Sequence, residues 1–101
     1  MTLYSENITM DKPIVEIEYC IKCRWLARAS WMAQELLSTF SNEIGGITLI
    51  PSNVAGIFEI RCDRNIIWER GKKNGMPDIK VLKQKVRDII APNKDLGHID
   101  S

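Results

Sequence analysis

The sequence predicts an α/β fold of two layers, in which a mixed four-stranded sheet carries two helices on one face. Three observations support this fold class. A strand-like run is followed by an amphipathic helical run and a second strand-like run, the pattern of a right-handed parallel crossover. Two further strand-like runs flank a short polar turn, as in an antiparallel hairpin. A second amphipathic run near the C-terminus supplies the other helix, so the predicted order is β-α-β-β-β-α.

The first strand and the first helix differ in hydrophobic period. In residues 13–19, Val15, Ile17 and Tyr19 alternate with other side chains, which predicts a strand with one buried face. Residues 24–40 then repeat at the helical period. The apolar side of this helix comprises Trp25, Leu26, Ala29, Met32, Ala33, Leu36, Leu37 and Phe40.

The remaining elements follow from short apolar runs and their breakers. Residues 47–51 predict a strand that ends at a proline, and residues 56–62 and 65–70 predict a hairpin that turns at Asp63 and Arg64 without the usual glycine. The last helix has Ile79, Leu82, Val86, Ile89 and Ile90 on its apolar side. If both helices cover one face of the sheet, the other face is wet. Its polar side chains are Glu16, Glu18, Thr48, Glu59 and Arg61.

Length and composition predict one domain of 101 residues, with 45% hydrophobic and 27% charged side chains. We expect an N-terminal tail over residues 1–12, the domain over 13–92 and a C-terminal tail over 93–101. The sequence has no apolar run long enough to span a bilayer and no leader pattern at its start, so we expect no membrane partner and a cytoplasmic location.

The net charge of +1 does not indicate a polyanionic partner. Residues 70–87 are rich in lysine and arginine, but they contain no aromatic stacking platform and no binding motif. A solvated loop and the outer face of a helix explain this run, and we expect no nucleic-acid partner.

Cys20 and Cys23 form a C-x-x-C motif between the first strand and the first helix. We expect Cys20 at the end of the strand and Cys23 in the first helical turn, where the helix dipole stabilises a thiolate. Lys22, Arg24 and Arg28 add positive charge nearby. This spacing lets the sulfurs meet, so the pair can cycle between dithiol and disulfide. A C-x-x-C near a β-α-β pattern in a cytosolic protein is typical of a redox motif.

Other interpretations of the pair were weighed. The motif also supplies half of a zinc site, which Cys62 and His98 could complete. Cys62 alternates with apolar residues on a strand, however, and His98 lies in the expected tail, so we predict no metal site. Cys20 and Cys23 could also be apolar fillers, but a strand-helix junction suits burial poorly. A further alternative is a redox-regulated binding module, in which oxidation alters a surface that a protein partner recognises.

The motif and its surroundings resemble a known family. "VEIEYCIKCRWLARASWMAQELLSTF", "GIFEIRCDRNIIWER", "GMPDIKVLKQKVRDIIAP" and "LGH" are similar to bacterial selenoprotein W-related proteins of the Rdx family. The resemblance runs from about Pro13 to His98. It implies a thioredoxin-like fold and a redox role. Selenocysteine-containing relatives carry that residue at the position of Cys23, where this chain has sulfur, which argues against a peroxidase activity. The stretch that matches the cis-proline of thioredoxins is "SNVAG", without a proline, and Pro77 is expected to start the last helix.

The predicted function is therefore a thiol-disulfide oxidoreductase with Cys20 and Cys23 as its catalytic pair. We expect protein thiols or disulfides as partners, no bound cofactor, and glutathione or a thioredoxin system as the source of reducing equivalents. By analogy with thioredoxins, Cys20 would be the exposed attacking sulfur and Cys23 the covered, resolving one. The position of selenocysteine in relatives favours the opposite assignment, but this chain has sulfur there, and we predict that Cys20 attacks and Cys23 resolves.

Three large apolar side chains suggest an interface, and the expected partner is a second copy of the chain. Trp31 lies opposite the apolar side of its helix. A two-residue turn in the hairpin places Ile66 and Trp68 on the same face as Glu59 and Arg61, away from the helices. Isolated surface aromatics are common, so the alternative is that these residues have no partner.

Overall fold

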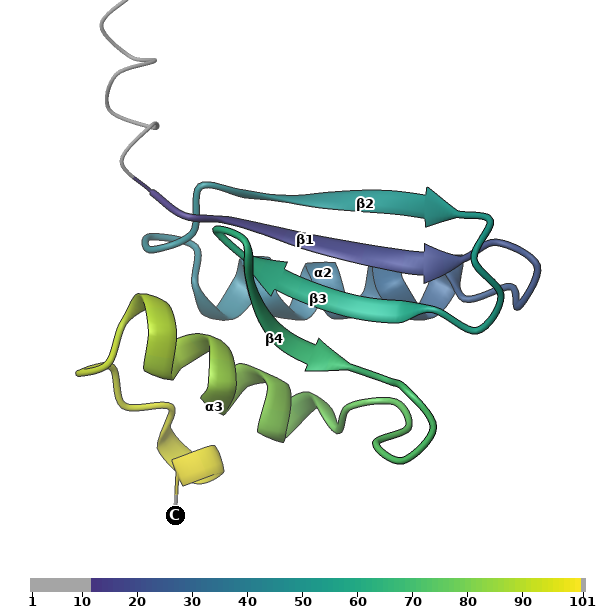
Figure 1. Cartoon of the computed structure of the whole chain (residues 1–101). Helices are drawn as coiled ribbons and strands as arrows, with labels where there is room; N and C mark the ends of the chain where they lie inside the picture. The colour runs from purple at the N-terminus through teal and green to yellow at the C-terminus, as the bar shows by residue number, and fades with distance from the viewer. Residues whose placement is uncertain (1–11, 101) are drawn as a thin grey trace, which may run out of the picture.

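The structure of the protein is a computed structural model, which describes residues 12–100. The chain order of its elements is the predicted one, with a short 3-10 helix added at the end (Figure 1). The elements are β1 (Ile14–Cys20), α2 (Leu26–Thr39), β2 (Gly46–Ser52), β3 (Phe58–Cys62), β4 (Asn65–Glu69), α3 (Ile79–Ile90) and η1 (Gly97–Asp100). Of the expected N-terminal tail, residues 1–11 lie outside the described residues.

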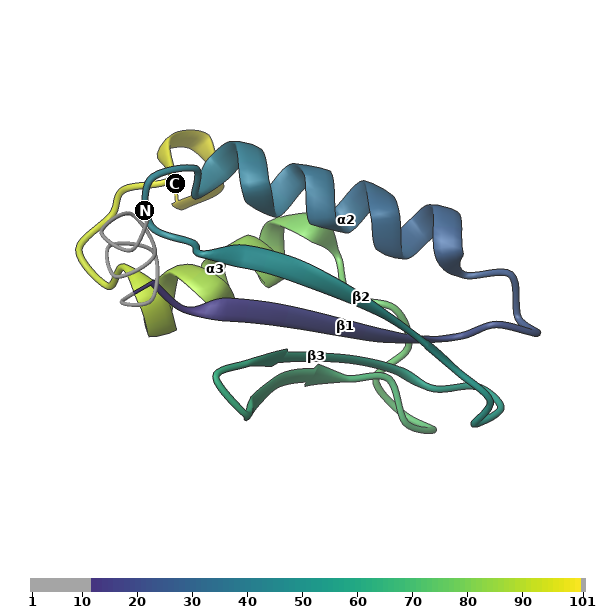
Figure 2. The ribbon, with the colours of Figure 1, turned by 90° about the horizontal axis from the view of Figure 1, so that it is seen from above.

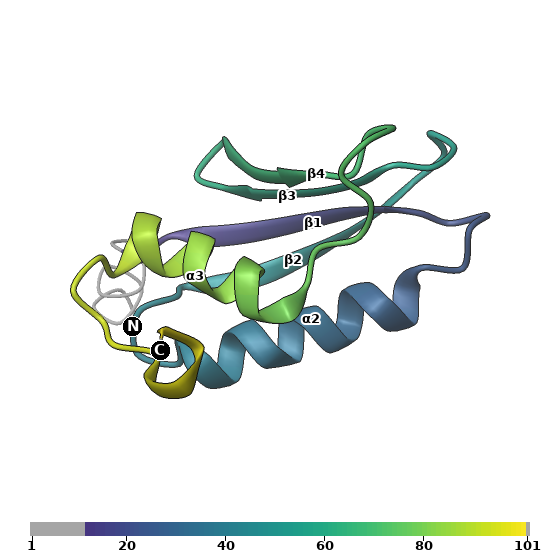
Figure 3. The same cartoon turned by 90° about the horizontal axis from the view of Figure 1, so that it is seen from below.

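The four strands form one mixed sheet in the order β2-β1-β3-β4. β2 runs parallel to β1 because α2 crosses over between them, whereas β3 is antiparallel to both β1 and β4. Both helices lie on one side of this sheet (Figures 2 and 3). The fold is thus the predicted two-layer α/β sandwich.

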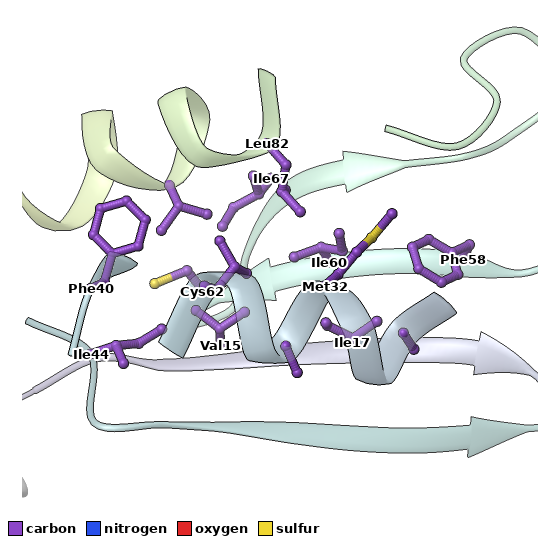
Figure 4. Packing of buried hydrophobic residues seen from close by; sticks show 14 of the residues in the cluster. Val15, Ile17, Met32, Phe40, Ile44, Phe58, Ile60, Cys62, Ile67 and Leu82 are labelled. Carbon is purple, nitrogen blue, oxygen red and sulfur yellow. The ribbon is translucent and has the colours of Figure 1, made fainter. Parts of the chain in front are cut away.

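The core lies between the sheet and the helices. Val15 and Ile17 of β1 are fully buried, and Tyr19 almost so, as the strand period predicted. Figure 4 shows their neighbours on β3 pointing toward the same space, which α2 and α3 close from the other side. The buried side of α2 is narrower than predicted, because Leu26 and Leu37 are exposed.

The face of the sheet opposite the helices carries a network of charges. Glu16 and Glu18 of β1 pair in register with Arg61 and Glu59 of β3, so all four side chains share this face. Arg61 donates hydrogen bonds to Glu16, Glu18 and Glu59 over 3.1, 3.0 and 3.2 Å, respectively. Burial alone would lower the pKa of Arg61, but these three hydrogen bonds raise it above its usual value. One guanidinium therefore holds three carboxylates on the predicted wet face.

The β3-β4 hairpin turns at Asp63 and Arg64, as predicted, and both residues have positive φ. The predicted register of β4 is only half right. Arg61 pairs with Ile66, but an irregularity between Ile60 and Arg61 makes Trp68 the partner of Ile60, on the helix side. Trp68 is therefore packed against the core rather than on the outer face.

The C-terminal residues pack against the domain instead of extending from it as a tail. Leu96 packs against the core, and Gln84 on α3 donates a hydrogen bond of 2.8 Å to the carbonyl of Ile99. At the other end of α3, Asp78 caps the helix, so Pro77 precedes the cap rather than starting the helix. Among residues 12–100, no helix has the length and apolar character needed to cross a bilayer.

Candidate redox site

Cys20 and Cys23 are joined as a disulfide where β1 ends. Two backbone hydrogen bonds fix the end of the strand: Cys20 donates to the carbonyl of Ile57 over 2.9 Å, and Ile21 donates to that of Ser52 over 3.1 Å. The N-H of Cys23 donates to Sγ of Cys20 over 3.2 Å. The pair therefore sits in a tight turn that is held by the loop between β2 and β3.

The position of Cys23 differs from the prediction. The helix begins at Leu26, and residues 21–24 form turns, so Cys23 lies before the helix and not in its first turn. The reason is local, because Arg24 has a φ of 61°, in the left-handed region that an α-helix cannot contain. Trp25 occupies the N-cap position, and its side chain makes no capping hydrogen bond.

The exposure of the two sulfur-bearing residues is also the reverse of the thioredoxin analogy. Cys20 is 1% exposed, whereas Cys23 is partly exposed. A sulfur must be reached to be attacked or to attack, so accessibility singles out Cys23.

Trp25, two residues after Cys23, makes contacts that sequence reasoning missed. Its ring meets Phe58 edge to face, with centroids 6.0 Å apart, and the guanidinium of Arg70 lies 4.9 Å from its centroid. Arg70 also donates its backbone N-H to the carbonyl of Phe58. The basic run that starts at Arg70 is the signal in the sequence, but periodicity does not reveal that Arg70 reaches Trp25.

The predicted cations Lys22, Arg24 and Arg28 are exposed around this turn. Arg24 and Arg28 line an open groove of about 460 Å³, together with Trp25, Ala27 and Trp31. The structure therefore places predicted Trp31 on a groove that begins at Arg24, the residue after Cys23. It does not bring Ile66 there: that residue is 56% exposed on the outer face of the sheet, in the other layer.

Cys62 is a core residue, as predicted. It is fully buried and pairs with Val15 at the opposite end of β1 from Cys20, so it cannot join the C-x-x-C motif in one metal site. Burial, together with the charge of Asp63, raises the pKa of the Cys62 thiol. Within residues 12–100, no cluster of three or more metal-ligating side chains occurs.

Comparison with known proteins places the chain in a family. The model of the Rdx family matches residues 14–88. A crystal structure of a protein from Bordetella parapertussis is 48% identical, covers 76% of this chain and 96% of its own, and has a TM-score of 0.73. The selenoprotein W-related protein from Vibrio cholerae is 51% identical, covers 76% of this chain and 95% of its own, and has a TM-score of 0.72. No curated protein matches the chain. With a thioredoxin-like fold and a family match over most of its length, the chain belongs to the Rdx family.

Proposed function

We propose that this protein is a thiol-disulfide oxidoreductase whose active pair is Cys20 and Cys23. The observation that carries this proposal is the turn in which the two residues are already bonded, with Cys23 accessible and Cys20 behind it. Membership of the Rdx family supports a redox role. A covered partner sulfur beside an accessible one suits a two-step exchange.

The exchange begins from the reduced pair and a substrate disulfide. The Cys23 thiolate attacks one substrate sulfur, forming a mixed disulfide and releasing the other substrate sulfur as a thiolate. Cys20, after losing its proton, then attacks Sγ of Cys23, which releases the second substrate thiolate and leaves the Cys20–Cys23 disulfide. Two electrons pass to the substrate, and the two protons of the protein thiols end on the substrate thiols.

Several features of the turn support these roles. Lys22 and Arg24 flank Cys23 in the chain and favour its anionic form. In the oxidised state, the N-H of Cys23 already points at Sγ of Cys20, the atom that becomes a thiolate when the disulfide opens. We therefore assign the first attack to Cys23, in contrast to the assignment favoured by the thioredoxin analogy.

The pair must be reduced again after each exchange. Glutathione or a thioredoxin system in the cytoplasm would supply the two electrons, and a protein thiol or disulfide would be the substrate. No bound cofactor is required for this chemistry. The homodimer expected from the sequence stays a prediction, but Trp31 and Ile66 lie in different layers, so the two residues would not share one flat interface.

A redox-regulated binding module is the second candidate function. The hydrogen bond from Ile21 to Ser52 links the turn to the end of β2, two residues before the exposed Val54. Opening the disulfide would loosen this turn and change the surface that a partner contacts. Such a protein would oxidise once and bind, without turnover.

Single cysteine variants test the roles of the pair. In a Cys62→Ala background, Cys20→Ser leaves Cys23 as the remaining thiol, and Cys23→Ser leaves Cys20. We expect Cys23 to be alkylated faster at every pH, and at neutral pH most clearly, because it is the accessible sulfur. Mixed disulfides with glutathione should form on Cys23 when Cys20 is serine. Faster alkylation of Cys20 would reverse the assignment.

Turnover separates the two candidate functions. The double-cysteine protein is equilibrated with reduced and oxidised glutathione, and free thiols are trapped to give the midpoint potential. We expect a midpoint within the range of cytosolic dithiol proteins and repeated reduction of a neutral small disulfide. A pair that oxidises once but never turns over would favour the binding module. Stoichiometric zinc on the pair would exclude both.

A further inference from the structure

The end of the molecule that carries the disulfide is built from three loops that are distant in sequence. They are the turn over residues 21–25, the loop over 53–57 and the loop over 70–77, and all three lie at the same end of the sheet (Figures 1 and 3). The cation-π contact between Arg70 and Trp25 ties the third loop to the first. We call this end, together with the first turns of α2, the redox end.

The redox end is strongly basic, although the whole chain has a net charge of only +1. Residues 19–34, 53–58 and 70–77, which build this end, contain no aspartate or glutamate. The cations in these segments are Lys22, Arg24, Arg28, Arg70, Lys72 and Lys73. The fold therefore joins two basic segments that the sequence keeps more than forty positions apart.

Most of these cations have no ion-pair partner within residues 12–100. Among the described residues, Lys22, Arg24, Arg28, Lys72 and Lys73 take part in no ion pair, while Arg70 lies over a tryptophan ring. Several cations elsewhere are paired: Lys83 binds Glu35 over 2.8 Å, and Lys94 binds Glu43 over 3.2 Å. The free charge of the redox end is thus available to a partner.

Two further features indicate that the partner is a polypeptide. The groove of about 460 Å³ between Arg24, Arg28 and Trp31 opens next to the C-x-x-C turn. Ile21 and Val54 are exposed on the two loops that flank the disulfide, so the basic surface also has apolar contact points. Arg24 lines this groove at a positive φ that glycine would adopt more easily.

We propose that the redox end docks an acidic polypeptide segment that carries the substrate disulfide. This inference rests on the proposed oxidoreductase function and names its substrate class. Carboxylates beside the substrate cysteines pair with Arg24, Arg28, Lys72 and Lys73, and an apolar or aromatic side chain packs on Trp31. The exchange itself is the one described above. Docking raises the encounter rate and the specificity of the exchange, and both effects weaken as salt screens the charges.

Matched peptides test the proposal. Three disulfide-linked peptides differ only in the residues flanking cysteine, which are glutamate, glutamine or lysine. The reduced protein is mixed with each, and thiols are trapped over time. At about 0.05 M salt we expect the acidic peptide to react roughly tenfold faster than the neutral one, with the gap mostly closed at about 0.5 M. Equal rates for all three peptides would overturn the docking proposal.

Charge variants locate the effect. Lys72→Gln/Lys73→Gln and, separately, Arg24→Gly should each reduce the preference for the acidic peptide severalfold. The matched control Arg64→Asn/Lys85→Gln removes two charges from the hairpin turn and the middle of α3, away from the redox end, and should keep the preference. An equal loss in the control would mean that net charge, rather than this surface, selects the peptide, and would also overturn the proposal.

A redox-inert protein separates docking from chemistry. In Cys20→Ser/Cys23→Ser, binding of the acidic peptide with serine in place of cysteine is followed by tryptophan fluorescence. We expect saturable, salt-sensitive binding that the neutral peptide lacks. Binding without any exchange in the native protein would support docking and remove the oxidoreductase function. Exchange without any preference for the acidic peptide would support the oxidoreductase function and overturn the docking proposal. Tighter binding of a single-stranded oligonucleotide of equal charge would overturn the choice of a polypeptide partner.

Discussion

The outer face of the sheet and the redox end differ in how their positive charges are neutralised. On the outer face, Arg61 is 20% exposed at its side chain and donates to three glutamates. At the redox end, Arg24 and Arg28 are exposed and make no ion pair with any described residue. A charge fixed by several partners contributes to the folded structure, whereas a free exposed charge adds little to it.

β1 takes part in both regions, one that stabilises the fold and one that we propose reacts with partners. β1 contributes Glu16 and Glu18 to the paired network and ends at Cys20, next to the cations that have no ion pair among the described residues. Substitutions in the two regions should therefore affect different properties of the protein. Those on the outer face should change the free energy of unfolding, and those at the redox end should change the reaction with partners.

The largest expected effect is that of Arg61→Met. Removing the guanidinium leaves three glutamates together without a cation, which we expect to cost about 1–3 kcal/mol in the free energy of unfolding. Urea unfolding followed by circular dichroism measures this cost. Adding Glu18→Gln/Glu59→Gln to the same chain should restore most of the lost stability, since the repulsion between the glutamates is then gone. A cost no greater than that of Arg28→Gln would break the comparison.

The second prediction extends the comparison to the thiols. Because burial raises the pKa of Cys62, the folded state holds this proton more tightly than the unfolded chain does. The resulting stabilisation is complete below the pKa of an unfolded thiol, about 8.5, and is lost as pH rises through the higher folded value. With the Cys20–Cys23 disulfide intact, stability should fall above about pH 8.5, by at most about 1.4 kcal/mol per pH unit from this thiol.

A variant isolates the contribution of this thiol. Cys62→Ala should lower the free energy of unfolding by about 1 kcal/mol at neutral pH, because it removes a buried atom from the core. Its stability should not show the fall at high pH that the thiol causes. The stability difference between the two proteins should therefore shrink at high pH, as measured by urea unfolding across the pH range. In the folded protein, Cys62 should also resist alkylation. A constant difference up to pH about 10 would contradict this account.

The smallest expected effect is at the redox end. Arg28→Gln should change the free energy of unfolding by less than about 0.5 kcal/mol, since this exposed cation has no ion pair with any residue from 12 to 100. Arg24→Gly should also be close to neutral, because relief of the positive φ offsets the greater freedom of glycine in the unfolded chain. Urea unfolding checks both. A large loss in either variant would assign these side chains a structural role.

Much of the fold could be predicted from the sequence, because periodicity reports directly on burial. Val15 and Ile17 are buried at the period of a strand, and Met32 and Leu36 at that of a helix. The turn at Asp63 and Arg64 could be placed from the spacing of the runs around it. The outward position of Trp68 was wrong, since one irregularly paired position moves a side chain to the other face, and the sequence pattern gives no sign of it.

The candidate site was predicted in its residues but not in its geometry. Cys20 and Cys23 were identified from spacing alone, and the structure joins them. The helical period could not reveal that Arg24 takes a left-handed conformation, so Cys23 was placed in the helix and taken to be the covered sulfur. The contact between Trp25 and Arg70 depends on how distant loops pack, which local patterns do not encode.

The irregular pairing that turns Trp68 inward has a consequence for self-association. β4 is the outermost strand on its side of the sheet, and its disturbed ladder is a poor template for a strand from another chain. On the opposite border, β2 contains Pro51, which has no N-H to donate. Both edge strands of the sheet thus resist strand addition, which protects the protein against edge-to-edge aggregation. Two copies would instead meet through the outer faces of the sheet or of the helices.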